Sequence, residues 1–423
     1  MKRGKALRII WAGIVVVCLF LYMPASAGAA DKVDIRIVGM MDMTGPYAAM
    51  HAPAIKVYQM FIDWANKTDY VPGVNIITDT YDHAMDISKA VAAYQMAMAK
   101  KPTPAITCGG YTSATILAIK PLAKRNHVPC LDGSSARNIL RPAGWAFSMQ
   151  AQYEGMTGAT GDWIKANWKP DSKYEWIRKH YENRKPRMAV VGWDNAFGRG
   201  FDQKESRAYI ESKGVEFVGA EYIPMSPSDT SPQVLRLVNN LKADFIFFGM
   251  YPSSHAIILK DAARLGIRDK FQDVGCFYDN IGHLSKYAGD LAEGSMQITS
   301  FQCIPDQWPE PMQQLFKETG FDAGLGMTFA SIITYYDTYC EVLRRAAKKV
   351  GAENVNGEVC YDVLTNFDNF KPMCSIGGMS FTKTKLAGID SMGMYQIQDG
   401  KMVLIQTGIY VPDLLPDGKD VPR

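Results

Sequence analysis

The sequence predicts an α/β protein built from two doubly wound lobes, each with a parallel sheet covered by helices. The first observation is that apolar, β-branched runs alternate with amphipathic runs between residues 34 and 131. The second is that a similar series begins after Gln150. Strands that alternate with helices pair in parallel, because each helix returns the chain to the same edge of the sheet. The third is length, since 423 residues exceed the ~100–200 expected of one domain.

The first series opens with a strand at 34–41, where β-branched residues partly alternate with polar ones. Thr44, Gly45 and Pro46 end this strand. Apolar residues then recur at helical spacing across 53–66, which predicts an amphipathic helix. Further strands are expected at 74–81, 105–108 and 128–131, and further helices at 88–100 and 113–125.

The second series repeats this order with branched and aromatic runs. Strands are expected at 187–192, 216–223, 244–250 and 271–276, and helices at 198–213, 232–241 and 253–265. The intervening stretch 168–186 has clustered charges and two prolines, so it is expected to be an exposed excursion. The tail from Val411 has three prolines and no period, and we expect it to be loosely held.

Residues 1–30 have the order of a cleaved secretory signal. Four basic residues lie within positions 2–8, an apolar run of fourteen residues spans 9–22, and small residues fill 25–30. Fourteen apolar residues fall short of the ~20 that span a bilayer. We therefore expect cleavage near Ala27 and a soluble protein of the periplasm.

The seven cysteines after the signal are widely spaced, and an odd number leaves at least one free thiol in an oxidising compartment. Cys360 and Cys374 lie fourteen residues apart in a loop-rich region and are the best candidates for a disulfide. Cys108 and Cys130 fall on neighbouring predicted strands, where we expect them to pack as small apolar side chains.

Charge and motifs exclude several classes of function. The formal net charge is +3, but four positive charges lie within residues 2–8, so the remainder is nearly neutral and nucleic acid is not expected as a partner. The motifs H-E-x-x-H, G-x-x-x-x-G-K-[ST], G-x-G-x-x-G and G-x-S-x-G are absent from the sequence. The six histidines show no ligand spacing. We expect no enzyme, no cofactor and no metal.

Four stretches carry a family resemblance, namely 37–48, 105–135, 189–200 and 229–266. Together they resemble the extracytoplasmic substrate-binding proteins of ABC transporters with the type I periplasmic binding fold, in the branched-chain amino-acid-binding (leucine-binding-protein-like) group. The resemblance implies two lobes joined by a three-crossover hinge. Lobe one would be 31–149 plus 300–375, and lobe two 150–299 plus 376–423. A long helix read at 327–349 would then return to lobe one.

Open α/β sheets bind ligands beyond the carboxyl ends of their strands. Tyr111, Thr112 and Ser113 lie there, and Ser113 begins a helix whose N-terminus favours an anion. The resemblance implies that this loop holds a ligand carboxylate; a plain helix cap requires the same residue type and stays open. Ser134 and Ser135 follow the next strand and match ligand-contacting positions of the family.

The resemblance also assigns residues on the other wall. Phe197 and Tyr251 match aromatic residues that cover the ligand, although a place in the lobe-two core is the alternative. Tyr47 lies near another such position. Phe277 stands where amino-acid-binding relatives have a glutamate for the ligand ammonium, and Asp279 lies two residues on. Either Asp279 supplies that carboxylate, or the ammonium site is gone and aromatic residues frame an aromatic or larger carboxylate.

The predicted function is a solute receptor. It would capture a small carboxylate-bearing ligand, an amino acid or an aromatic or organic acid, by hinge closure. As a monomer it would deliver that ligand to the permease subunits of an ABC transporter. A ligand sensor of the same fold for a signalling partner is the first alternative. A secreted hydrolase is the second, and the missing nucleophile motifs count against it.

Overall fold

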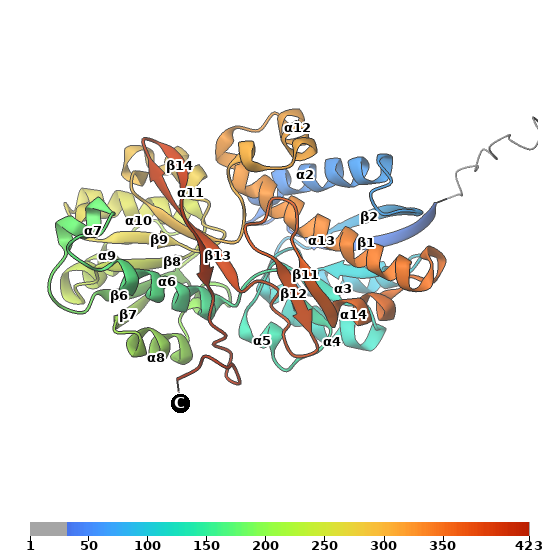
Figure 1. The fold of residues 1–423 in the computed structure, drawn as a ribbon, viewed down its shortest axis with the longest axis horizontal. Helices are drawn as coiled ribbons and strands as arrows, with labels where there is room; N and C mark the ends of the chain where they lie inside the picture. The colour runs from blue at the N-terminus through green and yellow to red at the C-terminus, as the bar shows by residue number, and fades with distance from the viewer. Residues whose placement is uncertain (1–31, 423) are drawn as a thin grey trace, which may run out of the picture.

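The computed structural model describes residues 32–422, which form two α/β lobes placed side by side (Figure 1). Each lobe is built round its own sheet, so the α/β architecture expected from the sequence is confirmed. The predicted signal segment 1–30 lies outside the described residues. Within 32–422, no helix is long and apolar enough to cross a membrane.

The first lobe contains a five-stranded parallel sheet with the strand order β2-β1-β3-β4-β5. Its strands are β1 (Val33–Met41), β2 (Val74–Asp82), β3 (Ile106–Cys108), β4 (Cys130–Asp132) and β5 (Ala146–Ser148). The first four agree with the sequence-based expectation. The fifth, of three residues, was not predicted.

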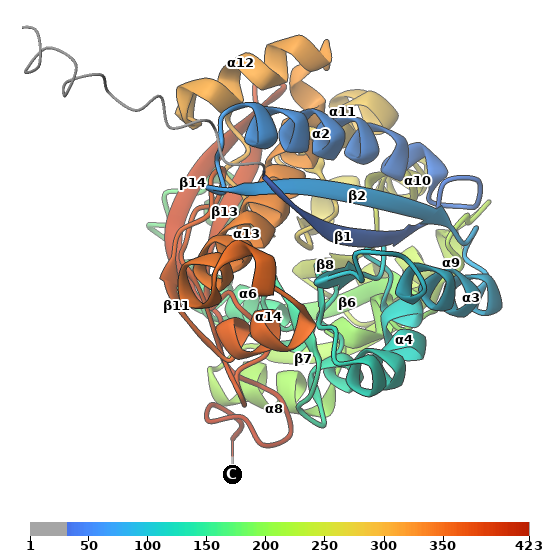
Figure 2. The ribbon, with the colours of Figure 1, turned by 90° about the vertical axis from the view of Figure 1, so that its right-hand side faces the viewer.

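Helices cover both faces of this sheet (Figure 2). The sequence-local ones are α2 (Ala48–Lys67), α3 (Ile87–Met98), α4 (Ser113–Asn126) and the single turn α5 (Arg137–Leu140). Three more come from later in the chain, namely α12 (Glu310–Thr319), α13 (Gly326–Val350) and α14 (Gly357–Leu364). The predicted return of a long helix to the first lobe is confirmed, because α13 packs along α2.

The second lobe contains a seven-stranded sheet with the order β14-β13-β10-β9-β8-β6-β7. Five strands run parallel, namely β6 (Arg187–Trp193), β7 (Glu216–Ile223), β8 (Phe245–Gly249), β9 (Gln272–Gly275) and β10 (Met296–Thr299). The helices of this lobe are α6 (Tyr153–Asn167), α7 (Glu175–His180), α8 (Lys204–Ser212), α9 (Ser231–Leu235), α10 (Pro252–Arg264) and α11 (Ile281–Ala288).

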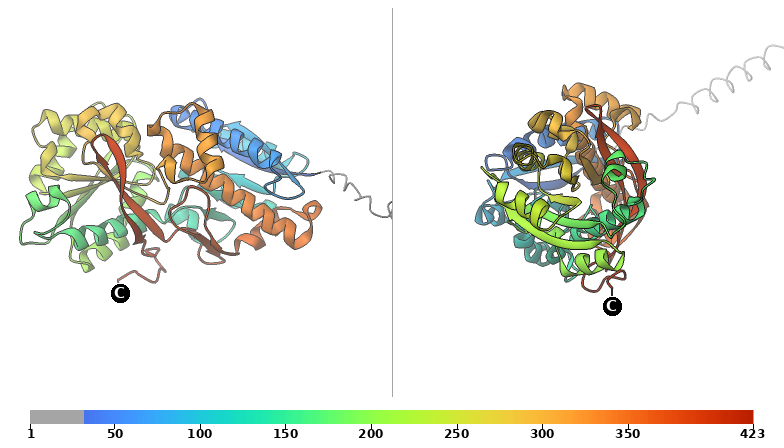
Figure 3. Two further views of the ribbon diagram at one scale, coloured as in Figure 1. Left: turned by 45° about the horizontal axis from the view of Figure 1, so that its top comes forward. Right: turned by 90° about the vertical axis from the view of Figure 1, so that its left-hand side faces the viewer.

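The expectation of an all-parallel second sheet is wrong at one edge. Strands β13 (Ser391–Gln398) and β14 (Lys401–Tyr410) form an antiparallel ribbon, and β13 also pairs antiparallel with β10 (Figure 3). The two strands are joined by Asp399 and Gly400 alone, both with positive φ. Asp-Gly is a favoured two-residue hairpin loop because its residues tolerate that conformation, so the sequence did contain a signal for this ribbon.

Two further expectations for the second lobe need correction. The helix expected at 198–213 is a short 3₁₀ turn followed by α8. The stretch 168–186 is not an exposed excursion, since it contains α7 and buries Trp168, Tyr174 and Ile177. Trp168 lies edge-on against Phe245 of the central strand β8, with ring centroids 5.9 Å apart. Burial of these large side chains fixes the segment to the lobe.

The C-terminal tail is also held rather than loose. Leu414 is fully buried, and its backbone N–H donates to Oε1 of Gln152 at 3.0 Å. Helix α6 has Gly155 and Gly158 where the tail crosses it, and a Cβ added to Gly158 would lie 2.8 Å from Leu414. The prediction of a loosely held tail, made from the missing hydrophobic period, is therefore wrong. The tail packs against α6 because two glycines of that helix allow it to approach closely.

The chain passes between the two sheets three times, after β5, after β10 and before β13. These connections lie side by side. The hydroxyl of Ser300 donates to Oε1 of Gln150 at 3.0 Å, and the N–H of Ile376 donates to the carbonyl of Ser300 at 2.8 Å. Phe301 and Ser375 form an antiparallel bridge. The lobe limits expected at these points stay a prediction.

The disulfide expected between Cys360 and Cys374 is absent. All seven cysteines of the described chain are free and buried. Cys360 lies on α14 inside the first lobe, whereas Cys374 lies in a connection between the sheets, where its carbonyl accepts the N–H of Gln302 at 2.9 Å. Sequence spacing could not reveal this separation, because α14 and a small β-ribbon, β11 (Asn366–Phe370) with β12 (Met379–Thr382), direct the two residues to different places.

Candidate ligand-binding site

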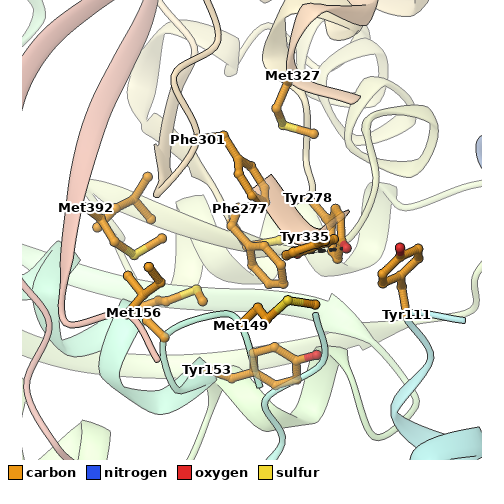
Figure 4. Packing of buried hydrophobic residues seen from close by; sticks show 14 of the residues in the cluster. Tyr111, Met149, Tyr153, Met156, Phe277, Tyr278, Phe301, Met327, Tyr335 and Met392 are labelled. Atoms are coloured by element: carbon orange, nitrogen blue, oxygen red, sulfur yellow. Dashed lines mark hydrogen bonds between the residues drawn. The ribbon is translucent and has the colours of Figure 1, made fainter. Parts of the chain in front are cut away.

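Loops from the two sheets meet between the lobes. Loops at the carboxyl ends of parallel strands lie along one edge of each sheet. In the first sheet they follow β1, β3 and β4, and in the second they follow β6, β8 and β9. Figure 4 shows Tyr111 of the first lobe facing Tyr278 and Phe277 of the second, with Tyr153 beside them. These loops contain the residues selected from the sequence.

Asp132 organises the first-lobe wall. Its Oδ2 accepts the backbone N–H groups of Gly109 at 2.9 Å and Tyr111 at 3.1 Å, and its Oδ1 accepts that of Ser134 at 2.9 Å. Burial raises the pKa of this carboxyl group, while the N–H groups stabilise its charge. Gly110 has φ +69°, and a Cβ there would lie 1.8 Å from the carbonyl oxygen of Met40. Only glycine fits this turn.

The N-terminus of α4 has no side-chain cap. Thr112 is the N-cap residue, but its side chain makes no capping hydrogen bond. Within residues 32–422, Thr112 Oγ1 and Ser134 Oγ are buried without a hydrogen-bond partner. Ser113 Oγ lies 3.3 Å from the hydroxyl of Tyr153. The helix therefore presents first-turn N–H groups and adjacent hydroxyls, which together can bind an anion.

Aromatic rings form the second-lobe wall. The ring centroids of Trp193 and Tyr251 are 4.8 Å apart, and Phe197 lies 6.1 Å from Trp193 and 6.3 Å from Phe277. Phe277 packs against Tyr278 at 4.3 Å. Trp193 is the last residue of β6, and the other rings come from the loops after β6, β8 and β9, which gives one continuous aromatic surface.

Two tyrosines join the walls. Tyr47 of the first lobe lies 5.9 Å from Trp193 and 5.3 Å from Tyr251 between ring centroids. Tyr153, at the start of α6, contacts Phe277 at 6.0 Å and also approaches Ser113 of the first lobe. The lobes therefore touch across these rings. Sequence reasoning selected Tyr47 but missed Tyr153, which follows a connection between the sheets and not a strand end.

His51 was also missed. Its ring centroid lies 6.0 Å from that of Tyr47 and 6.2 Å from that of Tyr111. Burial lowers the pKa of His51 to about 4, so the imidazole is neutral near pH 7. The scattered histidines of the sequence gave no signal for this position, because its neighbour Tyr111 comes from a loop far away in the sequence.

Two predicted site residues, Ser135 and Asp279, form hydrogen bonds to other parts of the protein, Asp279 through one of its two oxygens. The hydroxyl of Ser135 donates to the carbonyl of Ala151 at 2.5 Å, in the first connection between the sheets. Asp279 is fully buried and binds Nδ1 of His255 at 2.7 Å through Oδ2. Its other oxygen, Oδ1, has no hydrogen-bond partner among the described residues.

His255 lies between two carboxylates inside the second lobe. Its Nε2 is 3.1 Å from Asp273, which also binds Arg268 at 2.8 Å. Burial disfavours the charged imidazole, but Asp279 and Asp273 outweigh it and raise the pKa of His255 to about 9. Burial raises the pKa of the Asp279 carboxyl group, and the neighbouring His255 opposes this shift. With His255 protonated and both carboxyl groups ionised, the four groups form a buried network of two cations and two anions.

The arrangement is suited to binding a small molecule with an anionic group and an apolar body. In the described part of the chain, no group of three His, Cys, Asp or Glu side chains could hold a metal ion. A model described as periplasmic binding protein matches residues 34–401. The chain belongs to the periplasmic binding protein family. The family expected from the sequence is thus confirmed.

Solved structures support the same fold for this periplasmic binding protein. A branched-chain amino-acid ABC transporter protein of Thermus thermophilus with bound valine superposes with a TM-score of 0.74 at 20% identity, covering 90% of this chain and 97% of that one. A solute-binding protein of Rhodopseudomonas palustris in complex with 3,4-dihydroxybenzoic acid gives 0.69 at 17%, covering 90% and 98%. A leucine-binding protein of Thermotoga maritima gives 0.66 at 16%, covering 88% and 98%. No curated protein matches the chain by sequence.

Proposed function

We propose that this protein is a periplasmic solute-binding receptor, which captures a small carboxylate-bearing ligand and delivers it to the permease subunits of an ABC transporter. The observation that carries the proposal is the uncapped N-terminus of α4, with two unpartnered hydroxyls, facing an aromatic wall of the other lobe. Residues 1–30 would direct export and be removed.

The ligand carboxylate binds at α4. Ser113, with the first-turn N–H groups, and the hydroxyls of Thr112 and Ser134 supply the donors. Tyr111 borders this position from its own strained turn at φ +59°. Two of the similar structures, whose bound molecules are valine and 3,4-dihydroxybenzoic acid, hold ligands that each carry a carboxyl group.

Binding closes the lobes about their three connections, with lobe one as 31–149 plus 300–375 and lobe two as 150–299 plus 376–423. The contacts of Tyr47 with Trp193 and Tyr251 belong to the closed form. A ligand that touches both walls stabilises that form in proportion to its differential affinity. The closed monomer is then the form that the permease recognises.

The first experiment is a thermal-shift screen of the purified protein against amino acids and aromatic acids, followed by calorimetry. A ligand at 100 times its Kd adds about 2.7 kcal/mol of stability, which a melting curve resolves. Small-angle scattering with and without the ligand then measures closure. A bound ligand that leaves the radius of gyration unchanged would contradict the hinge mechanism.

The second experiment tests the carboxylate site with Ser113→Ala. A hydrogen bond to a charged group contributes about 1.5–3 kcal/mol, so we expect the Kd to rise about 10- to 100-fold. Ser212→Ala, which removes an exposed hydroxyl from α8, is the matched control and leaves the Kd unchanged. Equal affinity of Ser113→Ala and the wild type would refute the assignment of the α4 N-terminus.

A further inference from the structure

Two of the buried acids beside the candidate site are already bound by the backbone. Asp42 follows β1, and its Oδ1 accepts the N–H of Gly45 at 2.6 Å while its Oδ2 accepts that of Tyr47 at 2.8 Å. Asp132 accepts three backbone N–H groups, as described above. Each carboxylate holds the turn of a loop of the candidate site, so neither can leave to pair with a charged group of a ligand.

The third acid, Asp279, is matched by a cation of the protein. His255 binds it at 2.7 Å, and the network behind it pairs Asp273 with Arg268. All four side chains are largely or fully buried, and their formal charges cancel with His255 protonated. An ammonium group added beside Asp279 would leave a surplus positive charge in a region with little water, which is strongly unfavourable.

What the second lobe does present is a set of rings. Trp193, Phe197, Tyr251, Phe277 and Tyr278 approach one another with centroid separations between 4.3 and 6.3 Å. Such separations suit offset or edge-to-face packing, and an aromatic ligand extends the same packing. The polar donors lie on the opposite wall, at α4. The two ends of the site therefore differ in chemistry.

From these contacts we infer that the ligand is a carboxylate with an aromatic body and no amine, and that His255 is a positioning residue that withholds Asp279 from the ligand. This inference rests on the proposed function and names its substrate class. It chooses between the two alternatives that the sequence left open for Asp279.

Matched ligand pairs test the inference directly. We expect 3-phenylpropanoate to bind at least tenfold more tightly than phenylalanine, because the two differ only in the amine. Leucine with 4-methylpentanoate provides the same comparison without a ring, and both should bind more weakly than 3-phenylpropanoate. Tighter binding of either amino acid would overturn the inference and leave the receptor function intact.

Glycine betaine is included because aromatic rings also bind quaternary ammonium groups. Tighter binding of glycine betaine than of 3-phenylpropanoate would overturn the inference as well. Binding of no carboxylate at all would refute the proposed function itself.

Variants test the role of each wall. Asp279→Asn is expected to leave the Kd for 3-phenylpropanoate within about threefold, whereas Phe277→Ala raises it more than tenfold. Phe217→Ala, a half-buried ring on β7, controls for loss of stability. Circular dichroism confirms that each variant is folded. If Asp279→Asn abolished binding while Phe277→Ala bound normally, the assignment of the two residues would be reversed.

A second, independent observation concerns α5, which belongs to the first lobe but binds the second. Its Arg137 pairs with Glu205 of α8 at 2.7 Å and with the fully buried Glu154 of α6 at 3.3 Å. Four residues on, Arg141 binds Asp417 of the C-terminal tail at 2.7 and 2.9 Å. Both arginines thus reach across the boundary between the lobes.

The first lobe holds α5 firmly in place. Lys120 of α4 donates to the carbonyl oxygens of Asn138, Arg141 and Pro142 at 2.9–3.2 Å. On the other side, the tail that carries Asp417 is fixed on α6 by buried Leu414. Because both ends are anchored, a rotation of the lobes cannot be absorbed by a loose segment.

We propose that α5 is a latch, which favours the closed lobes whatever ligand occupies the cleft. The ion pairs of Arg137 and Arg141 must separate or stretch when the lobes open, so they shift the population toward the closed form. Ligand affinity then depends on residues that touch no ligand, because apparent affinity scales with the fraction of the binding-competent state.

Arg141→Gln and Arg137→Gln test the latch in the full mature chain. We expect each to enlarge the radius of gyration of the ligand-free protein and to raise the Kd for 3-phenylpropanoate by about 3- to 10-fold. Arg207→Gln is the matched control, since Arg207 pairs with Asp202 inside the second lobe. If Arg137→Gln destabilises the fold, the test of the latch rests on Arg141→Gln alone. That variant leaves no buried charge unpaired, because the partner of Arg141, Asp417, is 64% exposed. Unchanged scattering and affinity in Arg141→Gln would overturn the proposal.

Discussion

Replacing Glu154 by Gln is expected to change how stability depends on pH. Glu154 is fully buried on α6, and it shares the guanidinium of Arg137 with Glu205. Burial raises the pKa of Glu154 from 4.5 to about 7 in the folded protein. Between these values the unfolded chain releases the proton while the folded chain keeps it. The free energy of unfolding therefore falls as the pH rises through this window.

The magnitude follows from the shift. One pKa unit corresponds to about 1.4 kcal/mol, so the wild type loses about 3 kcal/mol of this contribution between pH 4.5 and pH 7.5. Gln resembles the protonated acid and cannot ionise. We expect Glu154→Gln to match the wild type at pH 4.5 and to exceed its free energy of unfolding by up to about 3 kcal/mol at pH 7.5.

Urea unfolding at half-unit pH steps measures this difference. Glu205→Gln is the control of opposite sign, because Arg137 lowers the pKa of Glu205. Removing the Glu205 carboxylate therefore costs more stability at neutral pH than in acid. A constant difference between Glu154→Gln and the wild type across the whole range would refute the burial argument. So would a variant that is less stable than the wild type at pH 7.5.

Three further changes test the fold around the site. A non-glycine residue in the left-handed conformation costs ~1–2 kcal/mol. Gly110→Ala is expected to lower the free energy of unfolding by more than this, because the added Cβ would clash with a carbonyl oxygen, and thermal melting measures the loss. A chain ending at Tyr410 loses the buried Leu414 and should unfold at least about 2 kcal/mol more easily in urea. His255→Gln leaves the buried carboxylate of Asp279 without its cation and is expected to cost about 3–5 kcal/mol. Adding Asp279→Asn should recover part of that loss, and a double variant less stable than His255→Gln would contradict the pairing.

Local sequence patterns predicted the succession of helices and strands. Local periods are set by chain geometry, and the strands at 34–41 and 187–192 were found because side chains alternate or stay apolar where both faces are buried. The loops after these strands could be named as site loops for the same reason. Parallel strands bring their carboxyl ends to one edge whatever the details of packing.

Some signals were in the sequence but pointed elsewhere. The Asp399–Gly400 pair marks a hairpin, yet an α/β interpretation left the antiparallel ribbon out. The prolines after Val411 suggested a loose tail, although Leu414 becomes fully buried. In both cases the local sequence pattern was outweighed by contacts with residues that are distant in the sequence.

Contacts between distant parts of the chain determine which polar groups remain available in the candidate site. Asp279 stands in the expected loop, but His255, from a helix 24 residues earlier in the chain, takes its carboxylate. Tyr153 and His51 reach the cleft from outside the predicted site loops. Charged groups and aromatic rings interact with whatever lies near them in space, and burial makes each such interaction strong. Sequence periodicity, in contrast, shows only on which face of a helix or strand a side chain lies.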